Sequence, residues 1–252
     1  DRRWLALAAR AGRHLEATAI LDEQGARWPA SVFDEPLGGF AHGATGAGWA
    51  LTRLGLSEAG DADDRHRWLS LPERAFDFEE SLWDDEAGNW IDVRKPESRD
   101  FADSWCHGSV GIGFAACDLH ERTGHPRHLH TLDRAVRAAA TGAWGHSHTL
   151  CHGDLSTWEL LDRAARIHPR LVPPSSVSGV ALVLSSIEEH GMVGGLARDA
   201  YNPGLMSGVS GSILQLARMH PACRFPSPLL MEYRMRADTR ITHTERNEAI
   251  AY

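Results

Sequence analysis

Four short glycine motifs divide the chain, and they constrain its fold more than any other feature of the sequence. They begin at Ala41, Trp105, Leu150 and Ser207, and they read Ala-His-Gly-Ala-Thr-Gly, Trp-Cys-His-Gly-Ser-Val-Gly, Leu-Cys-His-Gly-Asp and Ser-Gly-Val-Ser-Gly. Each motif precedes an apolar stretch, and consecutive motifs are roughly 45 to 65 residues apart, which leaves room for two helices and two loops per repeat. The sequence therefore predicts a repeated structural unit, in which only the first three copies carry Cys or His.

The stretches between the motifs predict alternating inner and outer helices. Apolar runs at 47–54, 112–119, 155–167 and 213–219 indicate inner helices, while amphipathic runs at 3–22, 63–81 and 129–144, and a further helix at 177–189, lie between them. A loop is expected over 24–39, and a short hairpin within 83–94. The fold class that we expect is all-α, an α/α toroid with the glycine turns gathered at one end of its inner ring.

Composition limits which partners and which cellular compartment are expected for this chain. The chain has 26 Lys and Arg against 34 Asp and Glu, a net charge of −8, and no basic stripe, which disfavours nucleic acid and anionic membranes as partners. Its longest apolar stretch, 177–187, is far short of the roughly 20 residues that cross a bilayer, so no membrane span is expected. Four Cys without a signal segment favour reduced thiols and a cytoplasmic location. We expect one domain over 1–230 and a charged, loosely ordered tail over 231–252.

Cysteine and histidine in the motifs predict a zinc site. Zinc prefers thiolate and imidazole ligands, and a catalytic site usually has three protein ligands and one open position. Cys106, Cys151 and His152 supply that number. Two thiolates and one imidazole suit a site that binds a substrate thiol and holds it as thiolate. The alternative is that both Cys are buried small apolar residues and that the His caps a helix, but packing alone does not require the same motif to recur.

Two further histidines are candidates for catalysis. His42 occupies the equivalent position in the first motif without a Cys neighbour, and a neutral imidazole near zinc can move a proton at physiological pH. Its alternative role is structural, through a bond to a neighbouring loop. His107 follows Cys106 and is a candidate acid, substrate contact or support of the ligands. Asp103 and Asp154 are expected to orient a ligand imidazole or to cap a helix, and capping is favoured for Asp154.

Several other residues have simpler interpretations. Cys117 lies within an apolar run and is expected to be buried and inert. Trp49 and Trp105 are close enough to the motifs to line a peptide cleft. The acidic turn at 84–86 is expected to be exposed and solvated.

Taken together, the motifs resemble those of the lanthionine synthetase C-like cyclases. Trp105-Cys106-His107 and the closing Gly-Leu-Met at 204–206 are most similar to the C-terminal cyclase domain of class II, LanM-type, lanthipeptide synthetases. The resemblance covers about residues 1 to 230. It implies an α/α toroid whose zinc ion is held by Cys106, Cys151 and His152. His42 matches the family's active-site His, implicated in proton transfer, and His107 stands where LanM-type members carry His and stand-alone cyclases often carry Tyr.

The resemblance also implies an activity. In this family zinc activates a Cys thiol of a ribosomally made precursor peptide, which adds to dehydroalanine or dehydrobutyrine and closes a thioether ring. The expected partner is therefore a dehydrated precursor peptide with its leader. A complete toroid is longer than this chain, so we expect the C-terminal part of the ring, with earlier helices and a dehydratase domain or partner upstream.

The sequence leaves three alternatives to a cyclase. The first is a LanC-like zinc protein that binds thiol peptides such as glutathione without cyclising them, and the second is an inactive truncated fragment. A glycosidase on an α/α toroid ranks last, because it needs paired carboxylates where this chain places Cys and His.

Overall fold

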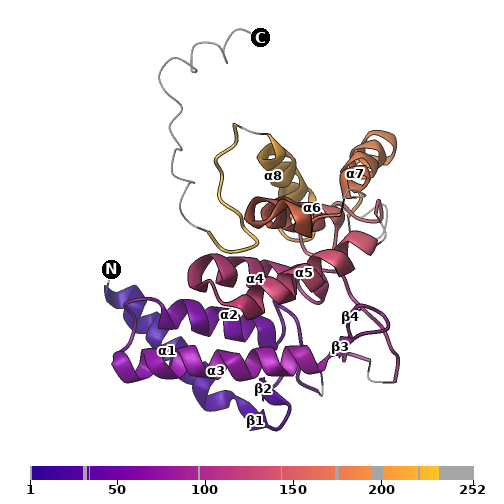
Figure 1. Ribbon diagram of the computed structural model, residues 1–252. Coiled ribbons are helices and arrows are strands. Elements are labelled where there is room, and N and C mark those ends of the chain that lie inside the picture. Colours follow the sequence, from indigo (N-terminus) through magenta and orange to yellow (C-terminus); the bar gives the residue numbers. More distant parts are fainter. Residues whose placement is uncertain are drawn as a thin grey trace.

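Eight α-helices and two small hairpins make up the part of the chain that the structure describes (Figure 1). The computed structural model describes residues 2–30, 33, 35–95, 97–142, 144–173, 176–194, 201–220 and 222–232. The elements in chain order are α1 (Arg2–Thr18), β1 (Ile20–Asp22), β2 (Gly25–Arg27), α2 (Ala44–Gly55), α3 (Ala62–Ser81), β3 (Trp83–Asp84), β4 (Asn89–Trp90), α4 (Ser109–Thr123), α5 (Pro126–Thr141), α6 (Asp154–Ile167), the 3₁₀ turn η1 (Pro169–Leu171), α7 (Ser176–His190) and α8 (Val209–Met219). The fold is all-α, as the sequence predicts.

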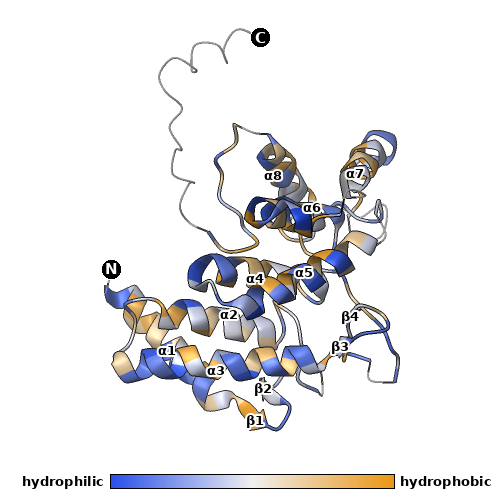
Figure 2. Ribbon diagram, viewed as in Figure 1, coloured by the Kyte–Doolittle hydropathy of each residue, from blue (hydrophilic) through white to orange (hydrophobic). Residues whose placement is uncertain are grey.

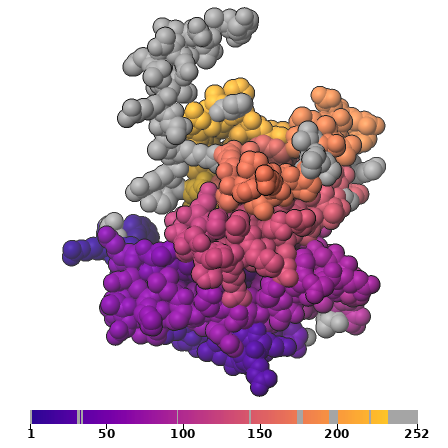
Figure 3. Space-filling view, in the orientation of Figure 1, coloured from indigo at the N-terminus to yellow at the C-terminus, as the bar shows by residue number. Residues whose placement is uncertain are grey.

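The helices are arranged in an inner arc and an outer layer. The four glycine motifs lead into α2, α4, α6 and α8, and these helices contact one another in that order. Outside them, α3 packs along α2, α5 along α4, and α7 along α6. In the space-filling view the chain follows this order, from purple at the base to yellow at the top (Figure 3). This is the inner and outer alternation of an α/α toroid.

Local signals in the sequence set where helices begin and end. Asp61 is the N-cap of α3: its carboxylate accepts the N–H of Asp64, and the Asp64 carboxylate accepts the N–H of Asp61. Pro126 is the first residue of α5, where the missing N–H costs nothing. α4 stops at Gly124, whose φ of +67° is favourable only for glycine. Hydrophilic and hydrophobic residues alternate along α3, as in a helix with one exposed face (Figure 2).

The main core lies between the inner helices. α4 is buried continuously from Ser109 to Leu119 and packs against Leu160 of α6, which explains why its sequence is apolar nearly all round. Leu229 and Leu230, which follow α8, complete this core and are almost fully buried. Burial of each leucine contributes about 1.5 to 3 kcal/mol, so this late segment is part of the folded unit.

The two hairpins test the finer predictions. The hairpin expected within 83–94 is confirmed, because β3 pairs with β4 and Trp83 lies opposite Trp90. The loop expected over 24–39 is partly wrong, because β2 pairs with β1, and the helix expected over 3–22 ends early at Thr18. The apolar rhythm of the helix continues beyond Thr18, but β2 contacts α3 and pairs with those residues. Tertiary contacts here outweigh a local pattern.

Most of the predicted tail, 231–252, lies outside the described residues, which include only Met231 and Glu232 of that stretch. Glu232 accepts a hydrogen bond from Arg163 of α6 and another from the N–H of Ser227, both 2.8 Å long. Glu232 is therefore tied to the inner arc. None of the helices in the described ranges is long and apolar enough to cross a bilayer.

Candidate metal centre

Each glycine motif forms the same loop, which turns back onto the first residue of the following helix. In all four loops this residue donates its N–H to the carbonyl seven positions earlier. The pairs are Ala44 with Leu37 (2.9 Å), Ser109 with Ala102 (3.0 Å), Asp154 with Ser147 (2.8 Å) and Val209 with Asn202 (2.9 Å). The repeat in the sequence is thus a repeat in the structure.

These loops need glycine because the backbone passes too close for a side chain. A Cβ atom at Gly46, Gly111 or Gly211 would lie 1.7, 2.0 or 1.7 Å from the carbonyl oxygen six residues earlier. Gly108 adds a second reason, since its φ of +107° favours glycine. The tight turns let the side chains that precede α2, α4 and α6 approach one another.

Backbone hydrogen bonds join the four loops in series. The N–H of Ala41 donates to the carbonyl of Cys106 (2.9 Å), that of Trp105 to the carbonyl of Cys151 (3.0 Å), and that of Cys151 to the carbonyl of Met206 (2.8 Å). The glycine turns are therefore gathered at one end of the inner arc, as predicted. Because the loops of Cys106 and Cys151 bond directly, the backbone itself brings the two thiols together.

Cys106, Cys151 and His152 form a cluster that could hold a metal ion. Their two sulfur atoms and a ring nitrogen lie within 4.8 Å of one another, and Sγ of Cys151 is 3.5 Å from Nε2 of His152. Cys106 is buried, Cys151 is half-buried and His152 is exposed. The structure thus brings the three predicted ligands together at a point that solvent can reach.

The cluster favours negative charge on Cys106. The hydrogen bond from the Cys151 thiol lowers the pKa of Cys106 to about 4, although burial opposes this change. The same hydrogen bond raises the pKa of Cys151. The thiolate of Cys106 in turn raises the pKa of His152. Negative charge on Cys106 would favour a cation held by these three residues.

The donor atoms fit zinc by type and by spacing. Bonds of about 2.3 Å to sulfur and about 2.0 Å to nitrogen place the ligand atoms of a tetrahedral site roughly 3.5 to 3.8 Å apart. The 3.5 Å between Cys151 and His152 matches this spacing, and the 4.8 Å limit for the whole cluster requires only small side-chain movements. Three protein ligands also leave a fourth position for a substrate group.

An open cleft of about 590 Å³ lies beside the first motif. Its lining includes His42 and the rings of Phe40, Trp49 and Trp105. Both Trp therefore line a cleft, as predicted, and the binding of a peptide there stays a prediction. Phe40 packs edge-on against both Trp rings, with centroids 5.0 and 5.4 Å away. His42 is exposed and directly follows Ala41, whose N–H donates to the carbonyl of Cys106 at 2.9 Å. Its position suits a proton carrier, and its catalytic role stays a prediction.

His107 follows Cys106 in the sequence, but its ring bonds a different partner. Nε2 of the buried His107 ring is 3.0 Å from Oδ1 of Asp92. Burial lowers the pKa of His107, and Asp92 opposes this change. Nδ1 has no hydrogen-bond partner among the described residues, and it lies near Gly39, where a Cβ would come within 3.3 Å of it. The catalytic role of His107 also stays a prediction.

Sequence reasoning missed Asp92 and Arg94. Burial raises the pKa of Asp92, but the hydrogen bonds from Arg94 outweigh burial and lower it to about 2. The charge of Arg94 also acts on Cys106 and His152. No local pattern distinguishes these two residues from the other charged residues of the hairpin region. Only the folded chain brings them to the cluster.

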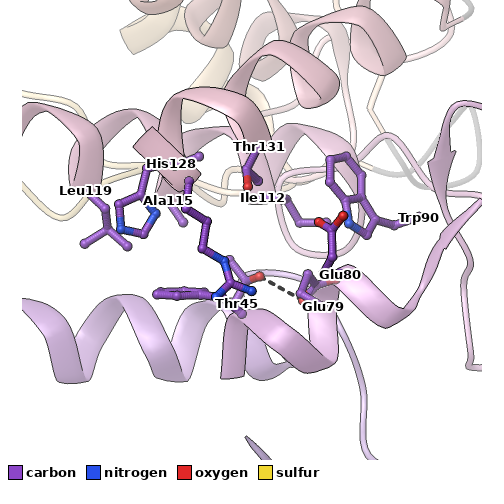
Figure 4. Close-up of a pocket in the computed structure, with 12 residues that line it drawn as sticks. Thr45, Glu79, Glu80, Trp90, Ile112, Ala115, Leu119, His128 and Thr131 are labelled. Carbon is purple, nitrogen blue, oxygen red and sulfur yellow. Dashed lines mark hydrogen bonds between the residues drawn. The ribbon is translucent and has the colours of Figure 1, made fainter. Parts of the chain in front are cut away.

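Glu79 was missed as well, and it supports the first motif from inside the protein. Its Oε2 accepts the N–H of Gly39 and the hydroxyl of Thr45, both at 2.8 Å. Figure 4 shows the bond to Thr45. Burial raises the pKa of this carboxyl, and the two hydrogen bonds oppose the change. Glu79, Trp90 and His128 line a small cavity of about 20 Å³. Its other lining residues come from α2 to α5, so the cavity belongs to the packing between layers and lies apart from the metal cluster. An acidic residue on the inner face of an amphipathic helix was the only signal in the sequence.

The two aspartates near the motifs have structural roles. The capping role expected for Asp154 is wrong, because Gly153 is the N-cap of α6 and the Asp154 carboxylate accepts the N–H of Gly145 at 2.8 Å. Asp103 accepts the hydroxyl of Ser109 at 2.6 Å, at the first residue of α4. The Asp154 carboxylate therefore holds loop backbone at the start of α6, and the Asp103 carboxylate holds the side chain of the first residue of α4.

The predictions for the acidic turn at 84–86 and for Cys117 have different outcomes. The acidic turn at 84–86 is exposed at Asp85 and Glu86, as expected. The expectation is wrong for Asp84, which is 8% exposed and accepts a hydrogen bond from Nε of Arg99 at 2.6 Å. Cys117 is fully buried, as predicted, and burial raises its pKa to about 12, which disfavours a reactive thiolate at neutral pH.

Comparison with known proteins extends this picture. A family model described as "Lanthionine synthetase C-like protein" matches residues 8–230. The matched range contains all four glycine motifs and the three residues of the metal cluster. No curated protein matches the chain.

Proposed function

Because the chain belongs to the lanthionine synthetase C-like family, we propose that it is a zinc-dependent lanthionine cyclase. Its substrate is a dehydrated, ribosomally made precursor peptide with its leader. A peptide Cys thiol adds to the β-carbon of dehydroalanine or dehydrobutyrine and closes a thioether ring. The observation that carries the proposal is the cluster of Cys106, Cys151 and His152, with donor atoms within 4.8 Å of one another.

These three residues would hold the zinc ion. When bound, zinc supplies a Lewis acid that lowers the pKa of a substrate thiol and makes it a thiolate at neutral pH. The chain contributes two sulfurs and one nitrogen, and with three ligands it leaves space for one substrate group. The exposure of His152 and the half-burial of Cys151 allow a peptide to reach this space.

The reaction adds S–H across a carbon–carbon double bond, so one proton has to move from the thiol to the α-carbon. A neutral imidazole accepts and returns a proton near pH 7. His42, exposed in the cleft and directly after Ala41, whose N–H donates to the carbonyl of Cys106, is the residue that we assign to this transfer. His107 is the second candidate, through the Nδ1 atom that has no partner among the described residues. The aromatic lining of the cleft suits apolar side chains that flank the reacting residues.

Thiol alkylation tests the proposal. The zinc-loaded protein is incubated with a dehydrated peptide that carries one Cys and one dehydroalanine, iodoacetamide is added, and mass spectrometry counts the alkylated thiols. We expect the wild type to abolish alkylation. Cys151→Ala is expected to lose both zinc and ring closure because it removes one of three ligands. Cys223→Ala, a partly exposed cysteine outside the motifs, is the matched control and is expected to keep both.

Two results would contradict the proposal. One is a Cys151→Ala variant that retains zinc and still closes the ring. The other is a wild-type protein that binds zinc and the peptide but leaves the thiol open to alkylation, which would identify a thiol-peptide-binding protein.

A further inference from the structure

Arg94 places a positive charge beside the metal cluster without belonging to it. We infer that Arg94 is a further catalytic residue, which donates a hydrogen bond to the carbonyl oxygen of the dehydro residue as that oxygen becomes an enolate. This inference rests on the proposed function.

The hairpin region carries Arg94 to the cluster. Arg94 follows β4 in a segment that is tied to the chain ahead of the second motif, because the N–H of Asp92 donates to the carbonyl of Asp100 at 2.8 Å. Oδ1 of Asp92, the partner of Arg94, is 3.0 Å from Nε2 of His107, which directly follows Cys106 in the second motif. The Asp92 carboxylate therefore bridges Arg94 to the motif that contributes Cys106.

Asp92 holds this guanidinium in a fixed orientation. Nε of Arg94 donates to Oδ1 and Oδ2 of Asp92 at 2.9 and 3.0 Å, and Nη2 donates to Oδ2 at 2.5 Å. The carboxylate is itself fixed, since its side chain is 11% exposed and Oδ1 also contacts Nε2 of His107. An arginine held in this way has little conformational entropy left to lose when it binds a substrate.

Part of the arginine remains available to a ligand. The hydrogen bonds of Arg94 to described residues use Nε and Nη2, and they leave Nη1 without a partner there. The side chain is 34% exposed. Arg94 therefore offers an oriented, charged donor that solvent and substrate can reach.

The local charge balance favours an anion that develops during the reaction. Asp92 offsets the charge of Arg94, so the pair attracts a permanent anion from water only weakly. A fixed donor still stabilises charge that appears in the transition state, because no reorganisation is needed at that moment.

Such a charge appears in the proposed addition. The substrate sulfur bonds to the β-carbon, the electron pair of the double bond shifts toward the carbonyl, and the carbonyl oxygen accepts the hydrogen bond from Arg94. His42 then gives the α-carbon the proton that the thiol released, and the carbonyl is restored. The enolate oxygen lies roughly 4 to 5 Å from the sulfur, so its donor has to stand near the cluster but outside it, as Arg94 does.

The test compares Arg94 with an arginine of the same segment. Arg94→Gln is expected to lower kcat about 100-fold, with KM and zinc content nearly unchanged, as for the loss of an oxyanion donor. Arg94→Lys keeps the positive charge but lacks the planar guanidinium, and its kcat is expected to be about tenfold higher than that of Arg94→Gln. Arg99→Gln is the matched control, because Arg99 pairs with Asp84 and Glu86, and it should retain wild-type kinetics. In Arg94→Gln the Asp92 carboxylate loses its charged partner. The double variant Asp92→Asn, Arg94→Gln removes that unpaired charge as well, and its kcat should fall by the same factor as that of Arg94→Gln.

Each contrary outcome has a distinct meaning. An Arg94→Gln variant that closes rings at the wild-type rate overturns the inference and leaves the proposed function intact. A wild type without ring closure overturns both. A rise in KM alone would assign Arg94 to binding a carboxylate of the peptide, and a parallel loss of zinc and activity would assign it to structure; either result overturns the inference.

Discussion

Replacement of Gly111 by alanine is expected to destabilise the fold and to weaken zinc binding together. A Cβ at this position would lie 2.0 Å from the carbonyl oxygen of Trp105 and 2.7 Å from Cβ of Phe40. Non-bonded heavy atoms prefer separations of about 3.5 Å or more, so the backbone of the second motif has to move by more than about 1 Å. Cys106 follows Trp105 directly, and its sulfur would move with that backbone.

Three effects set the size of the loss. Inside a helix alanine is more favourable than glycine by about 1 kcal/mol. Overpacking against rigid backbone costs about 3 kcal/mol. The shifted loop also loses the 3.2 Å hydrogen bond from the N–H of Gly111 to the carbonyl of Ser104, which is worth about 1 kcal/mol. The free energy of unfolding should therefore fall by about 3 kcal/mol.

Urea unfolding followed by tryptophan fluorescence measures this change. With an m-value of about 3 kcal/mol per M, the midpoint should fall by about 1 M. Competition with a chromogenic chelator should show weaker zinc binding in the same variant. Gly194→Ala is the control, since the nearest atom to its Cβ is 3.9 Å away, and it should stay within about 0.5 kcal/mol of the wild type. A Gly111→Ala variant with the wild-type midpoint and zinc affinity would refute the reasoning.

Two further substitutions test the buried carboxylate and the metal. Burial raises the pKa of Glu79, so ionisation of this carboxyl lowers the stability of the protein as the pH rises above the ordinary value of 4.5. The amide of Glu79→Gln can accept the same two hydrogen bonds without a charge. The variant should therefore have a higher urea midpoint than the wild type at pH 7 to 8 but not at pH 4. A lower midpoint at pH 7 to 8 would contradict this. A chelator should lower the thermal midpoint of the zinc-loaded wild type, because an ion at 1,000 times its Kd adds about 4 kcal/mol, and it should have no effect on Cys151→Ala. Equal shifts in both proteins would place the metal elsewhere.

The order of the helices could be predicted because burial and periodicity are linked locally. The run at 112–119 is apolar on all sides because α4 is enclosed on all sides, and the capping pair of Asp61 and Asp64 marks the start of α3 from within one turn. The β1–β2 hairpin could not be predicted in the same way. Its first strand continues the rhythm of α1, and only the contact of β2 with α3 changes the outcome.

The clustering of Cys106, Cys151 and His152 could also be predicted, because a repeat places equivalent residues at equivalent points of equivalent loops. Cys106 and Cys151 share one position in successive motifs, and their side chains meet. No repeat in the sequence distinguishes Asp92, Arg94 and Glu79 from other charged residues. A charged residue acquires its role from what lies opposite to it in space, and neither periodicity nor spacing records that.

Local sequence thus specified the helices, their alternation and the residue types gathered at their ends. Tertiary packing alone decided which loops bond to one another, which partner His107 takes, and that Arg94 stands beside the cluster. The reason is physical: capping and amphipathicity act over a few residues, whereas the hydrogen bond from Trp105 to Cys151 and the charge of Arg94 on His152 act between segments far apart in the chain.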